Sequence, residues 1–167
     1  LDKETTGLLL IAKNLKYAKF FSTLFKQKNI RKYYLALCEG VPKNDISEVN
    51  LNIKNKRLKI EKSFTKYKLL NKKNGISQLL YSPTTGKTHQ LRIVSKNIGC
   101  PIVGDNKYNG LSRSRNEKLM LHAYALKFSI ENKLFEYFVD LPDHFLTFIN
   151  KNNLKLIKNY QTYLDSF

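Results

Sequence analysis

The sequence contains little cysteine. Only Cys38 and Cys100 occur among its 167 residues, and neither lies in a C-x-x-C motif. Two cysteines in a chain of this length do not form the disulfide framework of small secreted domains. Such a chain buries a hydrophobic core without cross-links, and no signal peptide is recognisable at its start. We therefore expect a cytoplasmic protein.

Long hydrophobic runs and metal-binding motifs are also missing. The apolar run Leu8–Ala12 is far shorter than the roughly 20 residues that span a bilayer. The histidines (His89, His122 and His144) and the two cysteines show none of the spacings typical of zinc sites, such as C-x2-C or H-x3-H. The sequence therefore predicts neither a membrane span nor a metal centre.

Acidic residues are scarce: 13 Asp and Glu stand against 30 Lys and Arg, which leaves a formal net charge of +17. Solubility of a small domain needs a magnitude of only roughly 2–8. The excess predicts a polyanionic partner, nucleic acid before an anionic membrane surface, although a lysine-rich proteome would give the same composition. A membrane-surface protein needs a basic amphipathic helix, and the basic helix expected over 14–28 has the apolar stripe of a core-packing helix.

The spacing of apolar residues predicts the secondary structure. We expect a buried strand over Gly7–Lys13 and a helix from the capping Asn14 to Lys28. Asn74-Gly75 indicates a tight turn. Further strands are predicted over Lys32–Cys38, Ile76–Tyr81, Leu119–Ile130 and Leu134–Val139, a β-hairpin within Val49–Leu70, helices capped by Thr88 and Asp143, and a loop over Asn109–Asn116.

These elements predict a single α+β domain over residues 1–167. Its core is expected to be a mixed, mostly antiparallel β-sheet flanked by a few helices. We find no internal repeat and no low-complexity linker that would divide the chain.

Three segments carry recognisable motifs. The first, Leu1–Lys13, reads L-D-K-E-T-T-G-L-L-L-I-A-K, and the second, Lys32–Ala36, reads K-Y-Y-L-A. The third, Thr85–Arg92, reads T-G-K-T-H-Q-L-R and is followed by G-C-P-I-V-G-D over Gly99–Asp105 and by Tyr108. In order and spacing they resemble the RluA family of pseudouridine synthases. That family shows H-R-L-D-x-x-T-[ST]-G-L-L-L-x-A-K, K-x-Y-x-A, G-R-T-H-Q-[IL]-R and L-G-x-P-I-x-G-D-x-x-Y.

The resemblance extends from Leu1 to about Phe148. It implies the pseudouridine synthase catalytic fold and an enzyme that isomerises uridine in RNA. Finer features resemble the subgroup that modifies large-subunit ribosomal RNA, with transfer RNA as the other possible substrate. The reaction breaks a C–N glycosidic bond, turns the uracil and forms a C–C bond. It needs an ionised carboxylate, and we expect neither a metal nor another cofactor.

The resemblance assigns three catalytic residues. Asp2 is the carboxylate, held in a loop ahead of the expected strand; otherwise it is a solvated terminal residue. Arg92 pairs with that carboxylate and favours its ionised form; otherwise it is a surface charge. Tyr34 stacks on the base, which is worth about 1–3 kcal/mol, whereas Tyr33 takes the core position on the opposite face.

Other residues of the motifs are expected to contact RNA. Phosphate contacts position RNA without reading its sequence, and for His89 and Gln90 local hydrogen bonds at a helix start are an equally good interpretation. We expect His122 to be structural. The predicted contacts come from Lys3, Lys32, Lys87, His89 and Gln90, with further phosphate contacts from Lys54, Lys56, Arg57 and Lys59.

The chain departs from the family pattern at two places. It begins inside the first motif, without the His-Arg that precedes Leu1 in the family, where that Arg helps to displace the target nucleotide. Lys87 stands where the family usually has Arg, which keeps the charge but loses the planar fork. We expect an N-terminally incomplete, monomeric catalytic domain, without the RNA-binding domain that often lies upstream. The alternative is a non-catalytic RNA-binding or ribosome-associated module.

Overall fold

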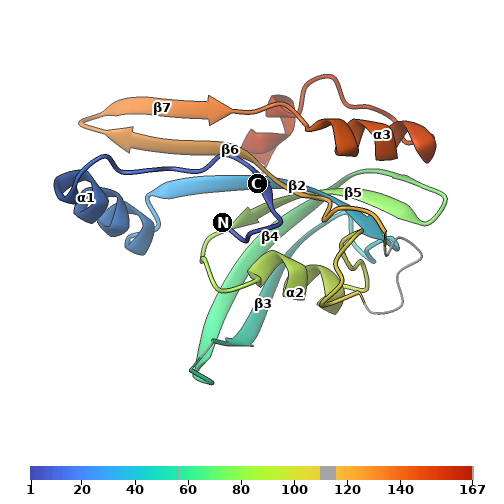
Figure 1. Cartoon of the computed structure of the whole chain (residues 1–167), viewed down its shortest axis with the longest axis horizontal. Coiled ribbons are helices and arrows are strands. Elements are labelled where there is room, and N and C mark those ends of the chain that lie inside the picture. The colour runs from blue at the N-terminus through green and yellow to red at the C-terminus, as the bar shows by residue number, and fades with distance from the viewer. Residues whose placement is uncertain (56, 110–115, 167) are drawn as a thin grey trace.

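The computed structural model describes residues 1–55, 57–109 and 116–166. The secondary structure follows the predicted α+β order (Figure 1). The elements are β1 (Thr6–Gly7), α1 (Leu15–Lys26), β2 (Ile30–Glu39), β3 (Ile46–Lys54), β4 (Ile60–Lys73), β5 (Ile76–Pro83), α2 (Gln90–Asn97), β6 (Leu121–Ile130), β7 (Lys133–Phe138), α3 (Asp143–Lys151) and the 3-10 helix η1 (Gln161–Ser166). Within the described ranges, no helix is long and apolar enough to cross a membrane.

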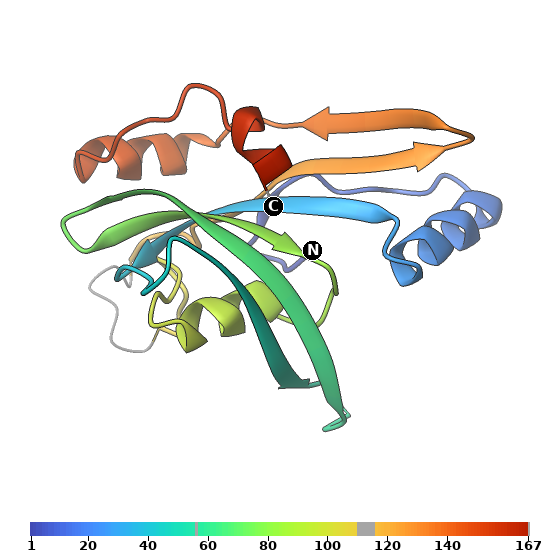
Figure 2. The ribbon, with the colours of Figure 1, turned by 180° about the vertical axis from the view of Figure 1, so that it is seen from behind.

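The strands of the described residues form one sheet of seven, in the order β1-β6-β2-β5-β4-β3, with β7 also paired to β6. Among these described strands, β1 alone is parallel to its neighbour, and the other pairs are antiparallel. This confirms the predicted mostly antiparallel sheet. The α2 helix covers one face, and α3 and η1 lie on the other (Figures 1 and 2).

The middle of the sheet is buried on both faces. Leu35, Ala36, Leu37 and Cys38 of β2 are all fully buried, which explains why this strand reads as an apolar run without alternation. On the α2 face, the hydroxyl groups of Tyr81 and Ser95 form a hydrogen bond of 2.7 Å that connects the helix to β5. The core thus fixes α2, which supplies one wall of the candidate site.

The structure contains the predicted turn at Asn74-Gly75 and the predicted hairpin within Val49–Leu70. Asn74 and Gly75, which join β4 to β5, have φ values of +52° and +77°, as a two-residue type I′ turn requires. In the β3–β4 hairpin, Thr65 is buried, whereas Lys62 and Lys66 are exposed. That hairpin extends well beyond the rest of the sheet (Figures 1 and 2).

The predicted strand over Gly7–Lys13 is wrong. Only Thr6 and Gly7 pair with β6, opposite His122 and Ala123, and Leu9 is exposed. The reason is that β7 occupies the same edge of β6 from Ala125 onward, so the chain has to leave the sheet after Gly7.

The helices also differ from the predictions in their ends and their packing. Asn14 caps α1 as expected, its side chain accepting a hydrogen bond from the Tyr17 backbone N–H at 3.1 Å, but the helix ends at Lys26 and buries no residue. From its expected core stripe, the Phe21 ring meets the Phe128 ring at 5.6 Å, and the Phe25 ring lies 6.0 Å from Lys32 Nζ.

The caps of the other two helices were also predicted wrongly. Thr88 does not cap α2: His89 precedes Gln90 in a left-handed conformation, φ +54°. Pro142, and not Asp143, is the residue before α3. Of the loop predicted over 109–116, residues 110–115 lie outside the described residues.

The first residues of the chain are anchored on β6. The Thr5 backbone N–H donates to the Asp2 carbonyl at 3.0 Å, which closes a turn, and the Thr6 hydroxyl lies 2.8 Å from Nδ1 of the buried His122. The structural role predicted for His122 therefore fits its environment. Gly7, at φ +107°, lets the backbone pass close to Ala123.

We expect Gly7→Ala to destabilise the fold by about 3 kcal/mol, because a left-handed Ala costs roughly 1–3 kcal/mol and overpacking costs a similar amount. A Cβ at this position would collide with the Ala123 backbone. Gly75→Ala is a matched control: its φ is +77°, but nothing lies within 4 Å of the added Cβ. Thermal or denaturant unfolding measures both variants, and equal losses would contradict the proposed close approach.

Candidate active site

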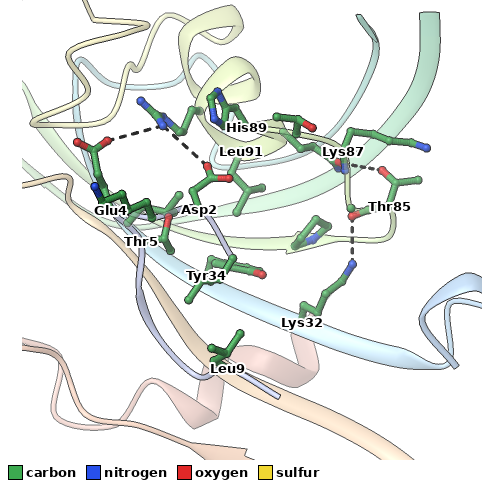
Figure 3. Close-up of a pocket in the computed structure, with 18 of the residues that line it drawn as sticks. Asp2, Glu4, Thr5, Leu9, Lys32, Tyr34, Thr85, Lys87, His89 and Leu91 are labelled. Atoms are coloured by element: carbon green, nitrogen blue, oxygen red, sulfur yellow. Dashed lines mark hydrogen bonds and ion pairs between the residues drawn. The ribbon is translucent and has the colours of Figure 1, made fainter. Parts of the chain in front are cut away.

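A cavity of about 1340 Å³ lies between the first ten residues, β2, the loop after β5 and α2 (Figure 3). Its charged lining is mainly basic, and such a surface attracts an anionic ligand. The basic residues are Lys3, Lys26, Lys32, Lys87, Arg92 and Lys107, and the acidic ones are Asp2 and Glu4.

Asp2 and Arg92 meet in this cavity, although 90 positions separate them in the sequence. Arg92 Nη1 is 3.9 Å from Asp2 Oδ2, and the Asp2 side chain keeps 27% of its surface exposed. The predicted pairing is therefore a long ion pair, because a charge-assisted hydrogen bond measures about 2.7–2.9 Å. Nη1 is equally far, 3.9 Å, from Glu4 Oε2.

The close partner of Arg92 is Asp105. Arg92 Nε donates to Asp105 Oδ2 at 2.8 Å, and Nη2 donates to Oδ1 at 2.7 Å. These hydrogen bonds raise the pKa of Arg92. Burial alone would raise the pKa of Asp105, but hydrogen bonds from Arg92 and from backbone N–H groups outweigh it and hold that pKa below its usual range. Our sequence interpretation did not assign Asp105 to the site, although it lies in the quoted G-D-x-x-Y motif.

Tyr34 and Lys32 line the cavity from β2, since alternate residues of a strand share a face. Burial, and then the negative charge of Asp2, raise the pKa of Tyr34, which keeps it a neutral phenol. Tyr33 is buried in the core, as predicted. The Lys32 ammonium donates to the Thr85 carbonyl at 3.1 Å, and burial lowers its pKa to about 8.

Gln90 is buried and fully hydrogen-bonded. Its Oε1 accepts from the Thr85 hydroxyl at 2.8 Å and from the Lys87 backbone N–H at 2.9 Å. Its Nε2 donates to the Phe64 carbonyl at 3.1 Å and to the Thr65 hydroxyl at 2.9 Å. The amide has no donor or acceptor left for RNA, so a direct contact does not fit this geometry. Gln90 instead holds the loop after β5 against β4.

The other predicted RNA contacts have different surroundings. Lys87 pairs with Glu61 at 2.9 Å, and His89 Nδ1 lies 3.0 Å from the Tyr108 hydroxyl. Lys3 is exposed at the cavity. Lys54, Arg57 and Lys59 are exposed at the far end of the β3–β4 hairpin and do not line the cavity, and Lys56 lies outside the described residues.

The chemistry of this cavity comes from a carboxylate, a guanidinium and a neutral phenol. In the part of the chain that the structure describes, no group of three or more His, Cys, Asp or Glu side chains is placed to hold a metal ion. The arrangement offers an ionisable oxygen nucleophile, a flat aromatic wall and a basic rim.

Comparison with known proteins gives related sequences over most of the chain. The ribosomal large subunit pseudouridine synthase C of Rickettsia bellii is 37% identical over 90% of this chain and 54% of its own length. The ribosomal large subunit pseudouridine synthase D of Borreliella burgdorferi is 33% identical over 90% of this chain and 50% of its own length. The chain thus spans about half the length of these relatives. An uncharacterized RNA pseudouridine synthase of Zymomonas mobilis is 33% identical, and the match covers 72% of it.

Solved structures show the same fold. Human RNA Pseudouridylate Synthase Domain Containing 4 superposes with a TM-score of 0.84 at 25% identity, over 93% of this chain and 75% of that one. Human RNA Pseudouridylate Synthase Domain Containing 1 gives a TM-score of 0.80 at 26% identity, over 99% and 77%. The sequence profile of the RNA pseudouridylate synthase family matches residues 1–97. By sequence and by fold, the chain belongs to the RNA pseudouridylate synthase family.

Proposed function

We propose that this chain is the catalytic part of an enzyme that isomerises uridine in RNA to pseudouridine, with Asp2 as its catalytic carboxylate. The observation that carries the proposal is the meeting of Asp2 and Arg92, 3.9 Å apart, in a large cavity with a mainly basic lining. Family membership supports the reaction class.

The residues of the cavity fit the steps of this reaction. An ionised Asp2 attacks the sugar or the base, or assists departure of the base. The neighbouring Arg92 favours the ionised carboxylate. Tyr34 offers a neutral aromatic face on which the uracil stacks, and its hydroxyl is available for proton transfer. Lys3, Lys32 and Lys87 contact phosphates around the target nucleotide.

The substrate we propose is large-subunit ribosomal RNA, because relatives at 33–38% identity are named ribosomal large subunit pseudouridine synthases C and D. We propose that the enzyme works in the cytoplasm, as a monomer, without metal or other cofactor.

A non-catalytic RNA-binding module is the second candidate function. The basic cavity favours it equally, because phosphate binding alone requires only positive charge. Asp2 distinguishes the two functions, since a module that only binds RNA gains nothing from a carboxylate facing a polyanion.

Asp2→Asn should abolish isomerisation, with a loss of at least about 1000-fold, because the amide keeps the size of the side chain but is not a nucleophile. The measurement is pseudouridine mapping in total RNA from cells that lack the gene and carry either the parent or the variant full-length protein. A single site restored only by the parent would identify the target uridine as well.

Glu4→Gln is the matched control for this experiment. It removes a charge at the same 3.9 Å distance from Arg92 Nη1, but from a side chain that is 58% exposed, so most of the activity should remain. Full activity of Asp2→Asn would overturn the catalytic assignment and leave the binding module as the function.

RNA binding should depend steeply on salt and survive Asp2→Asn. Neutralised phosphates release counterions, so log affinity should fall linearly with log salt by about 0.7 for each phosphate contacted on a single strand. Removing one basic side chain from the cavity, as in Lys107→Ala, should reduce the slope by about that amount. Filter binding at several salt concentrations measures it, and a flat response would mean that the charge of +17 reflects composition alone.

Activity should fall as the pH rises through about 8, where Lys32 loses its proton and with it the charge that holds a phosphate. The pH profile of kcat/KM reports groups of the free enzyme, and Lys32→Met should remove this descending step while lowering kcat/KM about 10-fold at pH 7.

Two checks separate this effect from unfolding. Burial disfavours the charged form of Lys32, so stability should rise between pH 8 and pH 10.5, and Lys32→Met should not lower the stability at pH 7. Lys26→Met, at an exposed lysine of the same cavity, should keep the descending step. An unchanged pH profile in Lys32→Met would contradict the role of Lys32.

A further inference from the structure

Asp105 holds Arg92 but does not itself line the cavity. Its carboxylate is fully buried and accepts four hydrogen bonds. Two come from the guanidinium, at 2.8 and 2.7 Å. The other two come from the backbone N–H groups of Lys107 and Tyr108, at 3.1 and 3.0 Å. Its oxygens are therefore fixed before any ligand enters the cavity.

The rest of this loop holds the guanidinium in the same place. The Tyr108 ring centroid is 5.3 Å from Arg92 Cζ, which is a cation–π distance. The Tyr108 hydroxyl is in turn 3.0 Å from Nδ1 of His89, the residue before α2. Nε and Nη2 of Arg92 are occupied by Asp105, and Nη1 is 3.9 Å from the carboxylates of both Asp2 and Glu4.

Three carboxylates thus surround one guanidinium, and the buried Asp105 takes the close position. Asp105 meets Arg92 at hydrogen-bond distance because backbone donors have already fixed its carboxylate. Asp2 stays beyond hydrogen-bond distance, in the electric field of the guanidinium. A carboxylate in a tight bidentate pair has its lone pairs engaged, and such a carboxylate is a poor nucleophile.

We propose that Asp105 is a positioning residue that keeps Arg92 beyond hydrogen-bond distance from Asp2. In this position Asp2 lies in the electric field of the guanidinium while its oxygens stay free to react. This inference rests on the proposed function, because it gives Asp2 the catalytic role. Asp105 touches neither substrate nor reacting atoms; it acts through Arg92.

The titration of Asp2 provides a direct reading of this arrangement. Arg92 from α2 and Tyr34 from β2 interact with its charge, and Glu4 lies equally close to Arg92. The other charged or titratable groups around the cavity are Lys3 beside Asp2, Lys26 from the end of α1, Lys32 from β2, Lys87 and His89 before α2, and Lys107 from the loop after it. All of these remain in the variants below, so a changed titration of Asp2 reports on Asp105 and Arg92.

Asp105→Asn and Asp105→Glu, made in the full-length protein, test the proposal. The first releases the guanidinium, and the second keeps the charge but lengthens the arm that holds it. Both variants should let Arg92 move onto Asp2. We expect kcat to fall at least about 10-fold, since a shift of about 1 Å at a reacting group costs on the order of 100-fold. The affinity for RNA should stay within about twofold.

The readout that separates positioning from general stability is the pH dependence. A tighter pair with Arg92 should move the acid limb of the kcat profile to lower pH in both variants. The Asp2 carboxyl carbon, followed by NMR without RNA, should titrate at lower pH than in the parent. The control is Asn109→Ala, which removes hydrogen bonds that the same loop donates to Glu39 and to the Ile102 carbonyl, but no contact with Arg92. This variant should leave both titrations unchanged.

Each outcome decides the question. A lower kcat with both titrations displaced supports the proposal. A lower kcat with unmoved titrations, or the same loss of kcat in Asn109→Ala, means that Asp105 serves stability alone and overturns it. A titration displaced only in Asp105→Asn with parental kcat shows a plain charge effect and also overturns it.

If Asp105→Asn does not fold, Asp105→Glu carries the test. Failure of the proposed function is separate: there, the parent protein itself makes no pseudouridine, or Asp2→Asn remains active.

Discussion

The buried Arg92 is the constraint on which the arrangement of the site depends. A guanidinium with 6% of its side chain exposed is tolerated only with a hydrogen-bonded countercharge, and breaking a buried pair generally costs about 3–5 kcal/mol. Asp105 supplies that countercharge and is itself fixed by two backbone N–H groups. The first turn of α2 and the loop after Gly104 therefore form one unit, and the other site residues are placed relative to it.

The first residues of the chain reach this unit through β6. Thr6 and Gly7 form a short parallel pair with β6, and the Thr6 hydroxyl meets the buried His122. Because β7 takes the rest of that edge, the strand β1 is limited to two residues. Among the described residues, the position of Asp2, the carboxylate proposed to react, thus depends on a small anchor, which is why a Cβ at Gly7 is expected to affect the site as well as the fold.

The basic lining of the cavity divides into fixed and free charges. Arg92 is held by Asp105, Lys87 by Glu61 and Lys32 by the Thr85 carbonyl, whereas Lys3 and Lys26 are exposed. Held charges lose little entropy when a ligand binds, so under the proposed function they suit the target nucleotide. The exposed lysines then suit the flanking phosphates, which contribute affinity without sequence information.

The sequence by itself determined the α+β class, the hairpin turn at Asn74-Gly75 and the family, because apolar periodicity, turn residues and motifs are local signals. Its motifs also named Asp2, Tyr34 and Arg92, which the fold brings to one cavity. Tertiary structure alone decided the rest. It made Asp105 the close partner of Arg92 and left Asp2 at 3.9 Å. It also saturated Gln90 with hydrogen bonds and ended the first strand at Gly7. Each of these depends on competition between groups distant in the chain for one partner or one sheet edge, and only the folded geometry resolves such a competition.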